Sequence, residues 1–238
     1  LRCLVGSEMC IRDSYHVNHL LGFFSAFNPD AIKNTRFYKG SFPAEYGGRL
    51  SSVVDVRMND GNRQEYHGNI SVGLLSARAN LEGPIVKDRS SFNVSVRRTW
   101  LDLITGTALA IVNKNSDTKE SFGYHFFDIN AKVNHSFSER SRAYLSFYMG
   151  QDAFRQGSKE KHEDSDDMFL WRWGNLIGSA GWNYVFGQKL FGNLMVGYSR
   201  FRSHIRQEAK GYEIEGNRAE RQSIKRDSRY KSEMEDLS

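Results

Sequence analysis

Strict alternation of apolar and polar residues, repeated in segment after segment, is the feature that most limits the fold of this chain. From about Tyr66 onward, seven segments show a period of two. This period predicts β-strands, because successive side chains of a strand point to opposite faces. One face of each segment is apolar, and the other carries Asn, Ser, Asp, Lys and Arg. The apolar positions are Ile70, Val72 and Leu74; Ala77, Ala79, Leu81 and Ile85; Phe92, Val94 and Val96; Phe127, Ile129, Ala131 and Val133; Leu145, Phe147 and Met149; Leu176, Gly178, Ala180, Trp182 and Tyr184; and Leu194, Val196 and Tyr198.

The expected connections between these strands alternate in length. Short turns alternating with long polar loops are typical of a transmembrane β-barrel, which has one rim of turns and one rim of loops. A soluble β-sandwich has no reason to keep this rhythm, and its outward face would be polar. The expected short turns are 86–89, 138–141 and 187–189, and the expected long loops are 101–124, 156–168 and 207–225.

Composition agrees with many twisted strands. Aromatic residues make up 13% of the chain, with 21 Gly and only 3 Pro. The mean hydropathy of −0.59 would indicate a soluble protein, but such an average hides the apolar half of an alternating strand. The longest apolar stretch, Leu101–Val112, is shorter than the roughly 20 residues of a spanning helix. It predicts a helical insert that either packs on the rim of the barrel or helps cover a ligand entrance.

Aromatic side chains gather near the expected strand ends. Two interpretations carry equal weight: aromatic girdles at the two membrane interfaces, or the ordinary enrichment of aromatic residues in strands. These residues are Trp100, Phe126, Trp171, Trp173, Trp182, Tyr184 and Phe186.

Charge and motifs exclude several function classes. The net charge is +5 and the pI about 9.1, yet basic and acidic residues are interspersed, without the basic stripe of a nucleic-acid-binding module. The seven His residues are scattered and adjoin no nucleophile motif, so we expect neither an enzyme nor a cofactor. The acidic run 162–167 could bind Ca²⁺, although a solvated loop is favoured because the spacing of a calcium loop is lacking.

The first fourteen residues differ from the remainder. Cys3 and Cys10 leave a disulfide or a metal site open, but no His accompanies them. Charged residues interrupt the apolar core that an export signal needs, so we expect any such signal upstream. We expect residues 1–14 to be non-native or disordered.

Residues 15–62 predict a compact, turn-rich unit. Asn28 and Pro29 fit the cap and the first position of a helix. Short strands are expected at 35–40 and 52–58, with a turn between them at 42–50.

The ordered set of motifs in this unit resembles the C-terminal half of the plug of a TonB-dependent outer-membrane receptor. The matching residues are Phe27-Asn28-Pro29-Asp30-Ala31-Ile32, Tyr38-Lys39-Gly40 and Tyr46-Gly47-Gly48-Arg49-Leu50 through Val56. The sequence of these motifs is similar to that of the large receptors of Bacteroidetes-type bacteria. Leu81-Glu82-Gly83-Pro84-Ile85 and Arg97-Arg98-Thr99-Trp100-Leu101-Asp102 resemble the first barrel hairpins of those receptors.

The resemblance implies a fold, a location and partners. Residues 15–62 would be the C-terminal part of an α+β plug domain. Residues 63–238 would be the N-terminal part of an antiparallel transmembrane β-barrel, with about 7 to 8 of about 22 strands. The protein would lie in the Gram-negative outer membrane. It would take up an extracellular ligand when TonB, bound through a box N-terminal to the plug and outside this sequence, pulls on the plug. Membrane lipid and a surface lipoprotein are the further partners implied.

The expected site lies in the plug turn. Lys39 and Arg49 are candidates for charge pairs with acidic lumen residues, with solvated surface as the equal alternative. Gly40, Gly47 and Gly48 serve backbone geometry rather than ligand contact, and Tyr46 precedes the paired glycines. No catalytic, cofactor-binding or metal-binding residue is assigned.

Two other function classes stay open. A non-transporting outer-membrane barrel, such as an adhesin or a barrel enzyme, would have no plug. A secreted β-sandwich binding module would pack its apolar faces against each other in a water-soluble monomer.

Overall fold

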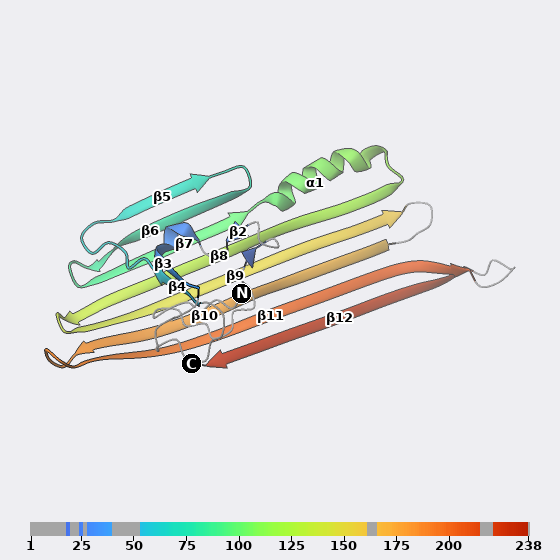
Figure 1. Ribbon diagram of the computed structural model, residues 1–238. Coiled ribbons are helices and arrows are strands. Elements are labelled where there is room, and N and C mark those ends of the chain that lie inside the picture. The colour runs from blue at the N-terminus through green and yellow to red at the C-terminus, as the bar shows by residue number, and fades with distance from the viewer. Residues whose placement is uncertain are drawn as a thin grey trace.

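A large antiparallel sheet dominates the computed structural model, which describes residues 18–19, 24–25, 28–39, 53–160, 166–214 and 221–237. Its eight strands follow one another in chain order, so every neighbour in the sheet is also a neighbour in sequence (Figure 1). The predicted mainly β fold is confirmed, and the sheet is open, with β5 and β12 at its edges. The strands are β5 (His67–Val72), β6 (Ser76–Val86), β7 (Ser90–Thr99), β8 (Thr118–Ser138), β9 (Ser141–Glu160), β10 (Asp166–Val185), β11 (Phe191–Ile214) and β12 (Arg221–Leu237).

A smaller unit precedes the sheet. Asn28 caps the short 3₁₀ helix η2 (Pro29–Ala31), and its side-chain oxygen accepts a hydrogen bond from the Asp30 amide at 3.2 Å. The predicted cap is confirmed, although the helix is a single 3₁₀ turn. β3 (Ile32–Tyr38) and β4 (Val53–Met58) then pair in a separate two-stranded sheet. β1 (Asn18–His19) and β2 (Phe24–Ser25) form another short pair.

Residues 28–39 and 53–60 lie against one face of the large sheet, which we call the inner face (Figure 1). Val56 and Met58 of β4 join Ala31 in a small apolar cluster with Tyr148 of β9 and Ile177 of β10. Tyr148 and Ile177 are register partners on neighbouring strands. The cluster is small, so apolar burial alone fixes this unit weakly, and polar contacts carry much of the remaining interface.

The two faces of the sheet have the opposite polarity to those of a soluble protein. On the inner face, Ser95, Asp128 and Ser146 are at most 1% exposed. On the other face, which we call the outer face, Leu145 and Val196 are 60% and 51% exposed. Soluble domains bury apolar residues and leave charges in water. The predicted alternation is confirmed, and within the described residues the outer-face positions do not meet a second sheet.

Strand length corrects part of the sequence prediction. The short turns at 86–89, 138–141 and 187–189 are confirmed, because strands end and begin at their borders. The long loops predicted at 156–168 and 207–225 are wrong: β9 and β10 run to Glu160 and from Asp166, and β11 runs to Ile214. Both faces of these strand ends carry polar residues. Period-two apolarity therefore disappears there, although the paired strands continue.

The helix predicted at Leu101–Val112 is confirmed as α1, with the same bounds. It lies beside the part of β8 that extends past the end of β7 (Figure 1). Thr105 Oγ1 donates to the Phe122 carbonyl at 2.9 Å, and Asn113 Nδ2 donates to the Glu120 carbonyl at 2.6 Å. The helix therefore satisfies backbone groups that an exposed strand edge would leave open.

Gly61 joins the N-terminal unit to the sheet in a backbone conformation that requires glycine. Its φ is +77°, and an added Cβ would lie 2.2 Å from the Phe92 carbonyl oxygen. We expect Gly61→Ala to cost at least about 1–2 kcal/mol of the free energy of unfolding, because the left-handed backbone alone costs that much.

A control for this change is Gly106→Ala in α1, where an added Cβ meets nothing within 4 Å. Alanine there should stabilise by about 0.5–1 kcal/mol, because glycine is unfavourable inside a helix. Urea unfolding of both variants would measure the difference. Equal effects at the two glycines would contradict the role given to Gly61.

Candidate functional site

The inner face carries an unusual density of buried polar and charged side chains beneath the N-terminal unit. Buried charges are rare in soluble proteins, because taking an ion from water costs several kcal/mol unless a partner is present. The buried polar residues of the inner face are Ser91, Asn93, Ser95, Arg97 and Thr99 on β7; Asp128, Asn130, Lys132 and Asn134 on β8; Ser146 and Asp152 on β9; and Asn175 and Ser179 on β10.

The first group of contacts centres on Asp60, which follows β4. Its carboxylate accepts from Lys132 Nζ at 2.7 Å and from Lys33 Nζ at 3.0 Å. Its backbone carbonyl accepts from Ser91 Oγ at 2.6 Å and from Asn134 Nδ2 at 2.9 Å. Burial acts to raise the pKa of the Asp60 carboxyl, but the two ammonium groups outweigh it and lower that pKa. Asp60 is therefore a charged anchor of the N-terminal unit on the sheet.

The second group pairs Arg97 of β7 with Asp128 of β8. Arg97 Nε donates to Asp128 Oδ2 at 2.6 Å, and the two side chains are 8% and 0% exposed. Arg97 also donates to the Ser25 carbonyl at 2.9 Å, and its guanidinium lies 4.9 Å from the centre of the Phe126 ring. The sheet thus contacts β2 through a residue already held by an ion pair.

The third group surrounds His19 of β1. His19 Nδ1 donates to Asp152 Oδ2 at 2.9 Å, and Nε2 lies 3.8 Å from Asp128 Oδ2. The imidazole stacks on Phe126, with ring centres 3.9 Å apart. The Tyr124 hydroxyl donates to Asp152 through a short hydrogen bond. His19, Tyr124 and Asp152 are at most 1% exposed, so the arrangement suits positioning of the chain and gives no access to a substrate.

Smaller polar contacts complete the interface. Asn28 Nδ2 donates to Ser95 Oγ at 3.0 Å, and Asn59 Nδ2 donates to Glu82 at 2.9 Å. Arg78 of β6 forms an ion pair with Asp30 at 3.1 Å. Each of these groups can exchange its partner for water, so an interface of this kind can separate without exposing a large apolar core.

The structure does not test the predicted site, of which it describes only Lys39. Lys39 ends the described stretch of the N-terminal unit as an exposed residue, with Nζ 5.9 Å from the Phe37 ring centre, and it forms no ion pair with a described residue. Gly40, Tyr46, Gly47, Gly48 and Arg49 lie outside the described residues. Two ion pairs across this interface have the reverse arrangement to the predicted one: the acidic residues Asp60 and Asp30 belong to the N-terminal unit, and the basic residues Lys132 and Arg78 belong to the sheet.

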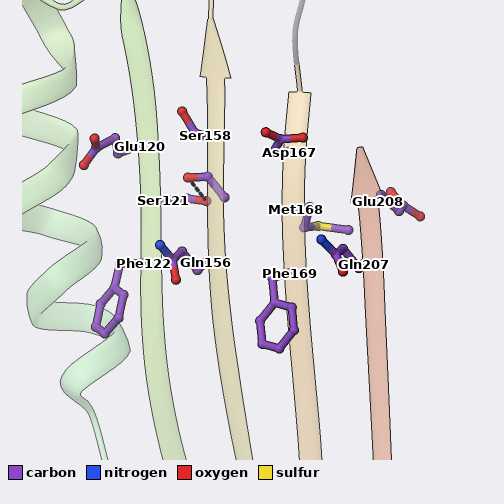
Figure 2. A pocket seen from close by; sticks show the side chains of 11 residues that line it. Glu120, Ser121, Phe122, Gln156, Ser158, Asp167, Met168, Phe169, Gln207 and Glu208 are labelled. Atoms are coloured by element: carbon purple, nitrogen blue, oxygen red, sulfur yellow. Dashed lines mark hydrogen bonds between the residues drawn. The ribbon is translucent and has the colours of Figure 1, made fainter. Parts of the chain in front are cut away.

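A hollow of about 650 Å³ lies near the ends of β8 to β11 that are opposite the short turns 138–141 and 187–189. Figure 2 shows Phe122 and Phe169 among polar side chains of neighbouring strands, and a hydrogen bond of 3.3 Å from Ser121 Oγ to the Gly157 carbonyl. Phe154 makes edge contacts with both of these Phe rings, with ring centres 5.5 and 6.0 Å apart. The lining residues are Glu120, Ser121, Phe122, Gln156, Gly157, Ser158, Asp167, Met168, Phe169, Gln207 and Glu208.

The acidic run 162–167 is described only at its end. Asp166 and Asp167 begin β10, and Asp167 borders the hollow, while residues 161–165 lie outside the described part of the chain. In the part that the structure describes, no three His, Cys, Asp or Glu side chains form a metal-binding group. Cys3 and Cys10 are also outside it.

Comparisons with protein-family models, with curated proteins and with solved structures found no match for this chain. Among the described residues, no helix has the length and apolar character needed to cross a bilayer.

Proposed function

We propose that this chain forms the C-terminal part of the plug and the first part of the barrel wall of a TonB-dependent outer-membrane receptor. Such a receptor takes up a ligand through a plugged β-barrel. The observation that carries the proposal is the inverted polarity of the sheet. Its outer face exposes apolar side chains such as Leu145 and Val196, whereas its inner face buries Asp128 and Lys132. A wall between hydrocarbon and a polar lumen requires this arrangement.

Strand length supports the same proposal. A tilted strand crosses the hydrocarbon layer with about 9–11 residues, and β9, β10 and β11 contain 20, 20 and 24 residues. On β10 the outer face is apolar from Leu176 to Tyr184, and the charged Arg172 lies beyond it. The remaining length of these strands would extend past the membrane on the side of the hollow near Phe122 and Phe169.

The interface between the N-terminal unit and the sheet suits a plug that must move. A plug held mainly by apolar packing would expose that surface on moving, whereas hydrogen bonds and ion pairs can be replaced by contacts with water. We propose that a siderophore, a cobalamin-like cofactor, an oligosaccharide or a peptide binds on the extracellular side, and that TonB then pulls the plug. The outer membrane of a Gram-negative cell is the proposed location.

Spin labels on adjacent residues test the membrane part of this proposal. Val96 and Ser95 of β7 point to opposite faces, with exposures of 41% and 0%. In bilayers, a label at Val96→Cys should be accessible to oxygen and protected from a water-soluble nickel complex, because oxygen concentrates in hydrocarbon. The label at Ser95→Cys should show no such lipid contact. High nickel accessibility at position 96 would contradict membrane embedding.

The transport proposal is tested by measuring ligand uptake in cells that lack the gene for this protein. Uptake of one of the four ligand classes should fall, and removal of TonB should reduce it to the same extent. Unchanged uptake of all four classes, or uptake independent of TonB, would contradict the transport proposal while leaving the membrane proposal in place.

A further inference from the structure

Cationic side chains gather on the outer face where its apolar band ends. On β10, the positions next to Leu176 on the same face, toward the N-terminal end of the strand, are Gly174 and Arg172. The register with β11 places Arg200 opposite Leu176, Arg202 opposite Gly174 and His204 opposite Arg172. The change from apolar to cationic residues therefore occurs at the same level on two neighbouring strands.

A shallow hollow lies at this border, with a volume of about 380 Å³. Its outer-face lining combines apolar, polar and cationic groups: Met149 and Gln151 on β9, Arg172, Gly174 and Leu176 on β10, and Arg200, Arg202 and His204 on β11. At this level β9 approaches Gly174 closely, because a Cβ there would lie 2.4 Å from the Gly150 carbonyl oxygen. The hollow thus joins the apolar band to a group of positive charges.

The positive charge is only partly balanced. Arg202 forms an ion pair with Glu233, and Glu235, opposite Arg200, accepts a hydrogen bond from Tyr198 at 3.1 Å. Neither Arg172 nor Arg200 forms an ion pair with any residue that the structure describes.

Arg172 also belongs to a second hollow, which lies between α1 and the sheet and has a volume of about 540 Å³. His125 and Arg155 line that hollow too. Asp102 partly offsets this charge, with its carboxylate 3.4 Å from His125 Nδ1. Arg172 is therefore shared by two adjacent hollows at the border of the apolar band.

We propose that Arg172 and Arg200 bind the phosphate group of an anionic membrane lipid, whose acyl chains lie along the apolar outer face past Met149 and Leu176. Guanidinium groups donate paired hydrogen bonds to phosphate oxygens. Basic residues at the membrane surface attract anionic lipid, and the apolar band below the hollow receives the chains. This inference rests on the proposed membrane embedding and adds to it a site selective for one lipid charge.

The test compares lipids in bilayers of phosphatidylcholine that contain a minor amount of phosphatidic acid. After the chain is reconstituted and purified with its surrounding lipid, the retained phosphatidic acid is measured relative to the bulk. We expect enrichment in the unmodified chain and a loss of about thirtyfold in Arg172→Gln/Arg200→Gln, because each of the two basic residues contributes about 1 kcal/mol near a membrane surface. Arg172→Lys/Arg200→Lys should keep most of the enrichment.

The matched control is Arg140→Gln/Arg142→Gln, two exposed arginines at the opposite, turn end of the sheet. This variant should retain phosphatidic acid like the unmodified chain. Equal retention in all variants, or enrichment that inorganic phosphate abolishes at millimolar concentration, would overturn the lipid site. If the unmodified chain inserts and shows no enrichment, only this inference fails. Failure to insert into any bilayer would overturn the membrane proposal as well.

Discussion

Replacing Asp60 with alanine is expected to destabilise the docked N-terminal unit by about 3 kcal/mol, because breaking a buried ion pair leaves the partner charge poorly compensated. That partner is Lys132, which is 1% exposed and has Nζ 2.7 Å from the Asp60 carboxylate. Its ammonium group cannot reach water without a rearrangement of the interface. Amide hydrogen exchange at Val56 and Met58 of β4, together with unfolding in lipid, would measure the loss of docking.

Two further variants separate this effect from a general loss of charge. Lys33→Ala removes the other ammonium beside Asp60, at 3.0 Å and 59% exposed, and should cost less than about 1 kcal/mol, as exposed pairs do. Lys132→Met should cost less than Asp60→Ala, because the Asp60 side chain is 35% exposed and water can solvate it. A Lys33 variant as damaging as Asp60→Ala would contradict the burial argument.

Acid should release the same contact. The pKa of the Asp60 carboxyl is lowered in the folded protein, because Lys132 and Lys33 outweigh its burial. A carboxyl with a lowered folded pKa contributes stability that is complete above its unfolded pKa, about 3.9 for Asp, and that is lost as pH falls through the folded value. Docking should therefore be independent of this group above about pH 5 and weaken below about pH 4. In Asp60→Ala, this part of the acid dependence should be absent.

The repeating strands could be predicted from sequence because each one alternates between two environments. Val94 and Val96 share the outer face, while Ser95 and Arg97 lie on the inner face, as the period of two requires. The short turns could be predicted because the strands on both sides of them have one clearly apolar face. The ends of β9, β10 and β11 were not, because outer-face residues such as Arg155, Lys159 and Glu208 are polar as well, so that the period-two contrast disappears.

The individual contacts of the site could not be predicted. Asp60 lies beyond the end of β4, and Lys132 lies 72 residues later on β8, so only the docking of the N-terminal unit brings them together. His19 and Asp152 are separated by 133 residues. The sequence indicated that Arg97, Asp128 and Lys132 occupy the polar face, but nothing in a period of two selects a partner across the interface.

Arg97→Met is expected to have the second large effect, about 3–5 kcal/mol, because it removes the guanidinium from a carboxylate that is fully buried. Arg97 Nε lies 2.6 Å from Asp128 Oδ2, and Asp128 is 0% exposed. The same change removes the hydrogen bond to the Ser25 carbonyl, so β2 should also lose protection in hydrogen exchange. Urea unfolding in lipid vesicles measures the global part of this effect.

The adjacent residue supplies the control for Arg97. Arg98 points to the outer face, is 61% exposed and has its guanidinium 3.8 Å from Asp102, so Arg98→Met should change stability by less than about 1 kcal/mol. The double variant Arg97→Met/Asp128→Asn should recover part of the loss, because a neutral amide replaces the uncompensated carboxylate. Recovery should be incomplete, since Asp128 also lies 3.8 Å from His19 Nε2. If Arg97→Met and Arg98→Met cost the same, the charged face is hydrated rather than buried, and the interface cannot position a plug in the way proposed.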